Sequence, residues 1–102
     1  MSFAEVELKI IRWAEARKII PNAKPHTQLM KAVSEMGELC DAELKGDLSK
    51  VRDGVGDVAV CLINYCALKD INFVDCLNEA YEEIKDRKGT TLPDGTFVKA
   101  SA

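Results

Sequence analysis

Several features that mark common classes of protein are missing from this sequence. It holds one histidine, His26, and its four cysteines show no CxxC spacing, so it lacks the ligand pattern of a zinc site. Its first residues lack the basic start and apolar run of a signal peptide, and no stretch reaches the length of a membrane span. We therefore expect a cytoplasmic protein with free, buried thiols, no zinc and no membrane association.

The sequence also lacks an excess of positive charge. Its formal net charge is -3 and its isoelectric point lies near 5.1, whereas stable nucleic-acid binding relies on a strongly basic surface. We expect no such binding. With 102 residues the chain has the length of one domain, and a monomer of this size buries only a modest core. We therefore expect a single domain over 1–102 that forms a homodimer or a homotetramer.

Four helices are predicted from apolar spacing, capping residues and helix breakers. Their approximate ranges are 3–19, 27–45, 48–69 and 73–88, with Gly46 and Gly89 as stops and Asp47 or Ser49 and Asn72 as caps. Prolines at positions 21 and 25 predict a loop over 20–26, because proline blocks helix continuation.

The C-terminal segment and the helix count together predict the fold class. Residues 90–102 contain Pro93 and the turn pair Asp94-Gly95, which predict a tail or a small hairpin. Helices joined by short loops favour a bundle. The expected fold is all-α, a four-helix antiparallel bundle with a short C-terminal tail, completed by oligomerisation.

Two apolar stripes are predicted to form the core. In the first helix the stripe consists of Phe3, Val6, Ile10 and Trp13. In the second it consists of Leu29, Met30, Val33, Met36, Cys40 and Leu44. The opposite arc of the second helix holds Gln28, Lys31, Glu35, Glu38 and Ala42. We therefore expect the functional face of this helix to be separate from its core face.

The third helix is apolar at almost every azimuth, so charge within it is unexpected. Asp53, Asp57 and Asn64 fall within about 40° of one another on its helical wheel. We expect Asp57 to be substantially buried, since it lies a full turn inside the helix among valines. A buried carboxylate is costly unless a cation or a proton compensates it. Asp53 is also explained by complementing the helix dipole, and Asn64 by hydrogen bonding within a core.

Two acidic pairs on consecutive helices predict a metal site. Glu35 and Glu38 are three residues apart and Asp53 and Asp57 are four apart, so each pair presents its oxygens on one helix face. Packed antiparallel, the two helices would form a cleft rich in oxygen. Such a cleft suits Mg²⁺, which takes hard oxygen ligands and often substrate phosphates. Taken alone, the first pair is also compatible with a solvated helix face.

Three stretches of the sequence resemble the MazG-type nucleotide pyrophosphohydrolases of the all-α NTP pyrophosphatase superfamily. They are QLMK with SEMGEL over 28–39, DGVGDVAV over 53–60 and DRKGTTLPDGTFVK over 86–99. The last looks like the ending of the short, single-domain members. Within the resemblance, Glu35, Glu38 and Asp57 match the acidic motif positions. Ser34 and Gly54 stand where the family commonly has glutamates, and Asp53 is the expected substitute for the second.

The resemblance implies hydrolysis of a nucleoside triphosphate, such as a dNTP or a modified NTP, to the monophosphate and pyrophosphate with Mg²⁺, or Mn²⁺ in its place. We expect Glu35, Glu38, Asp53 and Asp57 to bind the metal. Glu38 is the candidate base and Glu35 the second catalytic carboxylate. The candidate substrate-binding residues are Lys31, Asn64, Arg87 and Lys88. Trp13 and Phe97 are able to stack on a base, although core packing explains Trp13 as well.

Three alternatives remain, one of them within the same superfamily. A phosphoribosyl-ATP pyrophosphohydrolase-like enzyme would use the same carboxylates on a different nucleotide. A non-catalytic dimerisation or regulatory module would use the acidic face to bind a basic partner. A di-iron bundle is disfavoured because the chain lacks the Glu-x-x-His pattern.

Overall fold

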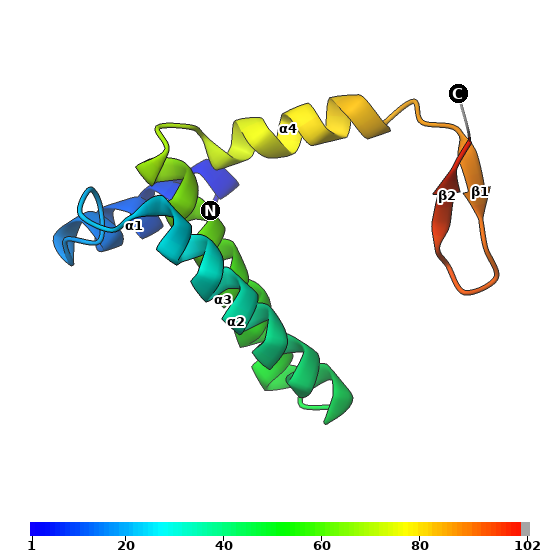
Figure 1. Ribbon diagram of the computed structural model, residues 1–102, viewed down its shortest axis with the longest axis horizontal. Helices are drawn as coiled ribbons and strands as arrows, with labels where there is room; N and C mark the ends of the chain where they lie inside the picture. Colours follow the sequence, from blue (N-terminus) through cyan, green and yellow to red (C-terminus); the bar gives the residue numbers. More distant parts are fainter. Residues whose placement is uncertain (101–102) are drawn as a thin grey trace.

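The computed structural model describes residues 1–100 and consists of four helices followed by a two-stranded hairpin (Figure 1). The elements are α1 (Phe3–Ala16), α2 (Pro25–Leu44), α3 (Leu48–Leu68), α4 (Phe73–Ile84), β1 (Gly89–Thr91) and β2 (Phe97–Lys99). The predicted all-α class with a short C-terminal tail is thereby confirmed. The end of the tail at 101–102 lies outside the described residues.

Three capping side chains, of which those of Asp47 and Asn72 were predicted, explain where helices begin. Ser2 accepts a hydrogen bond from the backbone of Glu5 at the start of α1, and Asp47 accepts one from Lys50 at the start of α3. Asn72 caps α4 in the same way, through Asp75. Each side chain satisfies a backbone N–H that the first turn of a helix leaves unpaired. The starts of α3 and α4 therefore agree with the sequence-based prediction.

Two boundaries next to the first loop differ from the prediction. α1 ends at Ala16 rather than residue 19, because Lys18 adopts a φ of 62° and Ile19 donates its N–H back to Ala14. α2 begins at Pro25, two residues before the predicted start. A proline at the first helical position costs no hydrogen bond, since that N–H has no partner within the helix. The loop therefore spans residues 17–24 and lies earlier in the chain than the predicted loop over 20–26.

The end of α4 was also predicted wrongly. The helix stops at Ile84, and Gly89 is the first residue of β1 instead of the residue that ends the helix. A Cβ at position 89 would collide with the carbonyl oxygen of Val98 in β2. The hairpin turn holds Leu92 N–H against the Thr96 carbonyl at 2.8 Å, with Gly95 at a φ of 90°. The predicted turn pair thus forms the hairpin.

Within residues 1–100 the four helices do not enclose a common core. α2 and α3 form an antiparallel pair, α1 packs against α3, and α4 meets the other helices only near its start (Figure 1). From there α4 and the hairpin extend away from the other helices. The Cα radius of gyration is 16.3 Å, whereas a compact chain of this length has about 13 Å.

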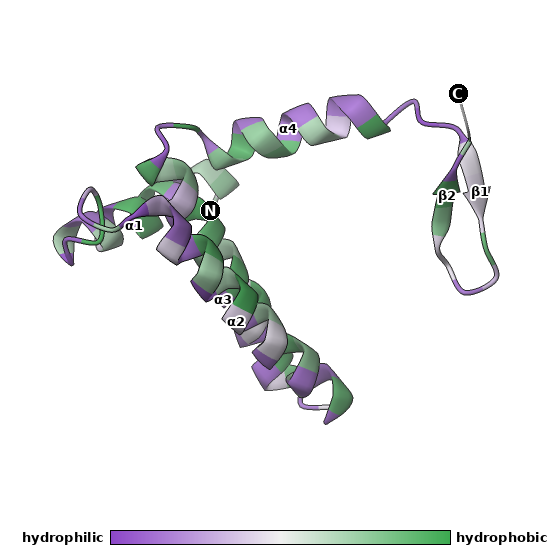
Figure 2. Cartoon of the chain, in the orientation of Figure 1, coloured by the Kyte–Doolittle hydropathy of each residue, from purple (hydrophilic) through white to green (hydrophobic). Residues whose placement is uncertain are grey.

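The core of the single chain is small, which corrects the predicted core. Its buried apolar residues are Ala14, Ala32, Ala42, Cys61, Ile63 and Cys66. Most members of the two predicted stripes are exposed, including Trp13 at 44% and Val33 at 68%. In Figure 2, apolar colouring runs along α4, which beyond its start lies apart from the other helices, and along part of β2, whose neighbour is β1. The residues of each predicted stripe lie on one helix, but the fold of one chain leaves most of them exposed to solvent.

The structure also bears on the predictions of free, buried thiols and of no membrane span. All four cysteines are free, with Cys61 and Cys66 buried and Cys76 half-buried, but Cys40 is exposed because it lies on the uncovered side of α2. Within residues 1–100, none of the helices combines the length and the apolarity that crossing a membrane would need.

Candidate functional site

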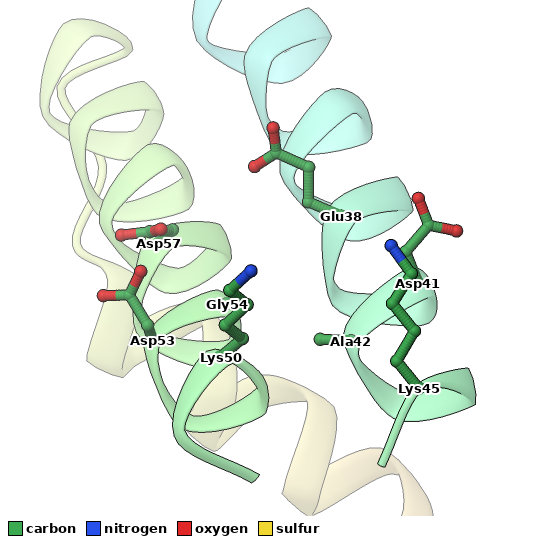
Figure 3. Close-up of a pocket in the computed structure, with 8 residues that line it drawn as sticks. All are labelled: Glu38, Asp41, Ala42, Lys45, Lys50, Asp53, Gly54 and Asp57. Atoms are coloured by element: carbon green, nitrogen blue, oxygen red, sulfur yellow. The ribbon is translucent and has the colours of Figure 1, made fainter. Parts of the chain in front are cut away.

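A cavity of about 370 Å³ lies between α2 and α3 and is lined mainly by charged side chains. Glu38 and Asp41 reach it from α2, and Asp53 and Asp57 from α3 (Figure 3). The remaining lining residues are Ala42, Lys45, Lys50 and Gly54. We call it the acidic cavity. Three of the four predicted metal-binding carboxylates therefore line one space.

Small residues bring the two helices close enough to form this cavity. Gly54 is buried, and a Cβ at that position would lie 3.2 Å from the Leu39 Cβ and 3.3 Å from its Cα. Ala42 is also buried at this interface. A glutamate at position 54, the residue common in the MazG family, would push against the backbone of α2. Close helix packing thus accounts for the glycine.

The predicted functional face of α2 is the face that packs against α3. Ala32 and Ala42 are buried there and Glu35 is half-buried. The predicted separation of a functional and a core face is therefore wrong within one chain. Asp57 is half-buried rather than enclosed, because it borders open space on both sides of α3.

Acidic side chains of both α2 and α3 act on the carboxyl group of Glu35. The pKa of Glu35 is raised, first by the hydrogen bond that its protonated carboxyl shares with Glu38, then by partial loss of water and by the charges of Glu38 and Asp57. Lys31 acts in the opposite direction. Burial likewise raises the pKa of the Cys61 thiol beside this cluster, against the effect of Lys31. Glu38 and Asp57 are therefore both close enough to Glu35 for their charges to act on it.

The donors in this cluster fit a hard divalent cation. All the donors are carboxylate oxygens. A bound cation would offset the repulsion between these like charges, which otherwise stabilises a protonated carboxyl group. Among residues 1–100, no three His, Cys, Asp or Glu side chains gather closely enough to surround an ion. Mg²⁺ needs fewer, because it usually binds through one or two carboxylates and completes its shell with water and substrate phosphates.

The four predicted substrate-binding residues lie in different places. Lys31 is exposed on α2 beside Glu35. Asn64 is buried at 2% exposure, and its Oδ1 has no hydrogen-bond partner among the described residues. Arg87 and Lys88 follow α4, where Arg87 lies 3.9 Å from Glu83, far along the segment that leaves the helices (Figure 1). One chain therefore does not bring Arg87 and Lys88 to the acidic cavity.

A second cavity, of about 390 Å³, shares Asp57 with the first. Its other lining residues are Val6, Lys9, Ile10, Trp13 and Val60, from α1 and α3. The Arg17 guanidinium stands 4.5 Å from the centre of the Trp13 ring. Trp13 was predicted to be either a core residue or a base-stacking residue, and it lies at a half-open apolar pocket beside the carboxylates.

Sequence reasoning missed three residues of the acidic cavity, namely Asp41, Lys45 and Lys50. Their spacing contained the signal. Asp41 and Lys45 follow Glu38 at steps of three and four, and Lys50 precedes Asp53 by three, so each continues a helix face already identified.

Comparison with known proteins adds one similarity. No protein-family model and no solved structure matches the chain. Over 70 residues, or 69% of the chain, it is 31% identical to a protein of Haemophilus phage HP1 described as an uncharacterized 18.2 kDa protein in the rep-hol intergenic region. The chain spans 41% of the length of that protein.

Proposed function

We propose that this protein is a magnesium-dependent nucleoside triphosphate pyrophosphohydrolase of the MazG type. The observation that carries the proposal is the meeting of Glu35 and Glu38 with Asp57 across two helices, beside a cavity large enough for a polyphosphate. The resemblance of the sequence motifs supports it independently. The product pair would be a nucleoside monophosphate and pyrophosphate.

The candidate metal ligands are Glu35, Glu38, Asp53 and Asp57, of which one or two would bind each ion together with water and substrate phosphates. When bound, Mg²⁺ or Mn²⁺ would supply charge neutralisation of the triphosphate and polarisation of its α-phosphorus. The raised pKa of Glu35 supports this proposal, because a cation bound beside crowded carboxylates would offset the repulsion between their charges.

The chain's own residues would handle the water and the phosphates. A water oxygen would form a bond to the α-phosphorus while the α–β anhydride bond breaks and pyrophosphate leaves. Glu38 would accept the proton of that water, because it is an exposed carboxylate of the acidic cavity. Lys45 and Lys50 line the same cavity and would attract the remaining phosphate charge. Lys31 is placed to do so from the other side of Glu35.

The second cavity supports a nucleotide over inorganic polyphosphate as the substrate. A nucleotide combines a charged chain with a flat apolar ring, and Asp57 lies at the junction of an acidic cavity and an apolar one. Trp13 and the aliphatic side chains around it would contact the base. Lys9 and Asp57 supply polar groups at the edge of that pocket.

The test is pyrophosphate release across a panel of canonical and modified nucleotides, with and without Mg²⁺. We expect turnover that requires the metal and yields monophosphate and pyrophosphate in equal amounts. Inclusion of phosphoribosyl-ATP separates the related activity by its product. Absence of turnover on every nucleotide, with binding of a basic partner unchanged by Asp57→Asn, would favour the non-catalytic module instead.

A further inference from the structure

The last part of the chain is held to the rest of the molecule only at its base. We call residues 73–99, which comprise α4 and the hairpin, the arm. At the base, the Phe73 and Phe3 rings lie 5.9 Å apart, and Asn72 Nδ2 donates to Glu7 Oε1 at 3.4 Å. Beyond it, Leu77, Tyr81 and Ile84 are 47%, 57% and 51% exposed. Within residues 1–100 the apolar side of the arm thus has no partner.

A second unpartnered apolar surface lies on α2. We call Met30, Val33, Met36 and Leu44 the α2 stripe; they are 66%, 68%, 46% and 86% exposed. The stripe faces away from α3, because α3 occupies the side that holds Ala32 and Ala42. It is about 21 Å long and α4 is about 18 Å long, at the helical rise per residue. The two surfaces therefore match in length and character.

The exposed area exceeds what a folded monomer shows. The accessible surface is 7830 Å², whereas a monomer of 11.3 kDa is expected to expose about 5,700 Å². The excess of about 2,100 Å² falls within the range that one subunit buries in an obligate homodimer. One copy of the same chain is therefore a sufficient occupant for both surfaces.

Charge links the same two surfaces to the acidic cavity. The segment after α4 reads Lys85-Asp86-Arg87-Lys88 and carries a net positive charge. On the α2 wheel, Asp41 and Glu38 follow directly after the edge of the stripe formed by Met30 and Leu44. A helix that lies on the stripe and runs in the same direction as α2 would therefore end near Leu44, one turn beyond Asp41 in the acidic cavity.

We propose that a second copy of this chain lays its arm on the α2 stripe and brings its Arg87 and Lys88 to the acidic cavity, and that the exchange is reciprocal. Such an interface is isologous, since each copy gives an arm and receives one. The catalytic half of the proposal rests on the proposed function, whereas the assembly half stands on the surfaces alone.

The assembly is tested by sedimentation equilibrium of the full chain and three variants. Val33→Glu and Ile84→Glu place a charge on the stripe and on the arm, and each should shift the mass from a dimer or tetramer to a monomer while the helical circular dichroism persists. Val55→Glu is the matched control, because Val55 is 55% exposed on α3 outside both surfaces. A monomeric wild-type chain, or equal dissociation by all three variants, would overturn the proposal.

The exchange of the arm is tested by mixing two inactive chains. Glu38→Gln and the double variant R87A/K88A are co-expressed with different tags, and particles that contain both chains are isolated. An arm that acts in trans gives each mixed pair one intact site, so about half of the wild-type turnover per particle should return. An arm that acts in cis gives none. Glu38→Gln mixed with Asp57→Asn is the control, since both changes damage the receiving cavity and no recovery should occur.

The two tests separate the ways in which the inference fails. Loss of turnover in every preparation, including wild type, contradicts the proposed function but leaves the sedimentation result to decide the assembly. A stable dimer whose mixed particles stay inactive, when wild type is active, overturns the exchange of the arm.

Discussion

The α2–α3 pair buries small residues, whereas the arm leaves large apolar residues exposed. Between α2 and α3 the contact is made by alanine, glycine and half-buried carboxylates, and the helices approach closely. On the arm, large apolar side chains project from a helix and a hairpin that touch little else (Figure 2). Under the two proposals the α2–α3 pair carries the chemistry and the arm carries the assembly, so a substitution in the acidic cavity should lower turnover without dissociating the assembly.

The largest expected effect is a loss of turnover from a substitution in the acidic cavity between α2 and α3. Replacement of Glu38 by glutamine should lower turnover by about 10²- to 10⁴-fold, because it removes the candidate proton acceptor without changing shape. The measurement is pyrophosphate release, with the sedimentation mass determined in parallel. Asp70→Asn, which changes a carboxylate outside the cavity, should retain activity. Wild-type turnover in the Glu38 variant would contradict its role.

Packing between the two helices is the next target. Gly54→Val should lower the free energy of unfolding by about 1–3 kcal/mol, because its side chain would press on the Leu39 backbone. Urea denaturation measures the change. Gly56→Ala is the matched control on the same helix, since nothing lies within 4 Å of a Cβ there, and it should stabilise by about 0.5–1 kcal/mol. Equal effects of the two would contradict close packing at position 54.

Trp13 is exposed outside the arm, and its replacement tests whether this side chain contacts a nucleotide or a second copy of the chain. Trp13→Ala should raise KM for a nucleotide about tenfold, as expected for the loss of one base–aromatic contact, with a smaller change in kcat. Inorganic tripolyphosphate should inhibit the variant and the wild type equally. A change of sedimentation mass with an unaltered KM would instead place Trp13 in the assembly.

The pH dependence of stability reports on the crowded carboxylates. Because the folded pKa of Glu35 is raised, its ionised form destabilises the fold, and stability recovers as the pH falls through that pKa. Without Mg²⁺, Glu35→Gln should therefore have the higher Tm at neutral pH, and its advantage should shrink on acidification. Added Mg²⁺ should raise the Tm of the wild type more than that of the variant. A constant difference at every pH would contradict the crowding.

The smallest expected effect concerns the hairpin turn of the arm. The Thr96 backbone N–H donates to Asp94 at 2.9 Å and, with the Thr96 hydroxyl, lowers the pKa of that carboxyl. A lowered folded pKa means that this support is complete above the ordinary Asp value of about 3.9 and is lost as the pH falls through the lower folded value. The Thr96 amide resonance should report the transition, and Asp94→Ala should abolish it. Titration of that resonance at an ordinary Asp pKa would contradict the contact.

The candidate site was predictable where it depends on spacing along one helix. The pairs Glu35/Glu38 and Asp53/Asp57 were identified because residues three or four apart share a helix face. The electrostatic contact of Glu35 with Asp57 was inferred only on the assumption that the helices pack together, and the structure supplies it. Arg87 and Lys88 were placed near the site on the basis of charge alone, and the fold of one chain puts them elsewhere.

By itself, the sequence determined the helices, their caps and the tight hairpin turn, because these depend on contacts between residues a few positions apart. Only the tertiary structure decided which side of α2 meets α3, since buried alanines and Gly54 set the approach of the two backbones more strongly than the larger apolar stripe does. It also decided that Asp57 borders two cavities and that the stripe stays uncovered. The physical reason is that apolar residues on a helix require cover without specifying which surface provides it, whether that surface belongs to the same chain or to another.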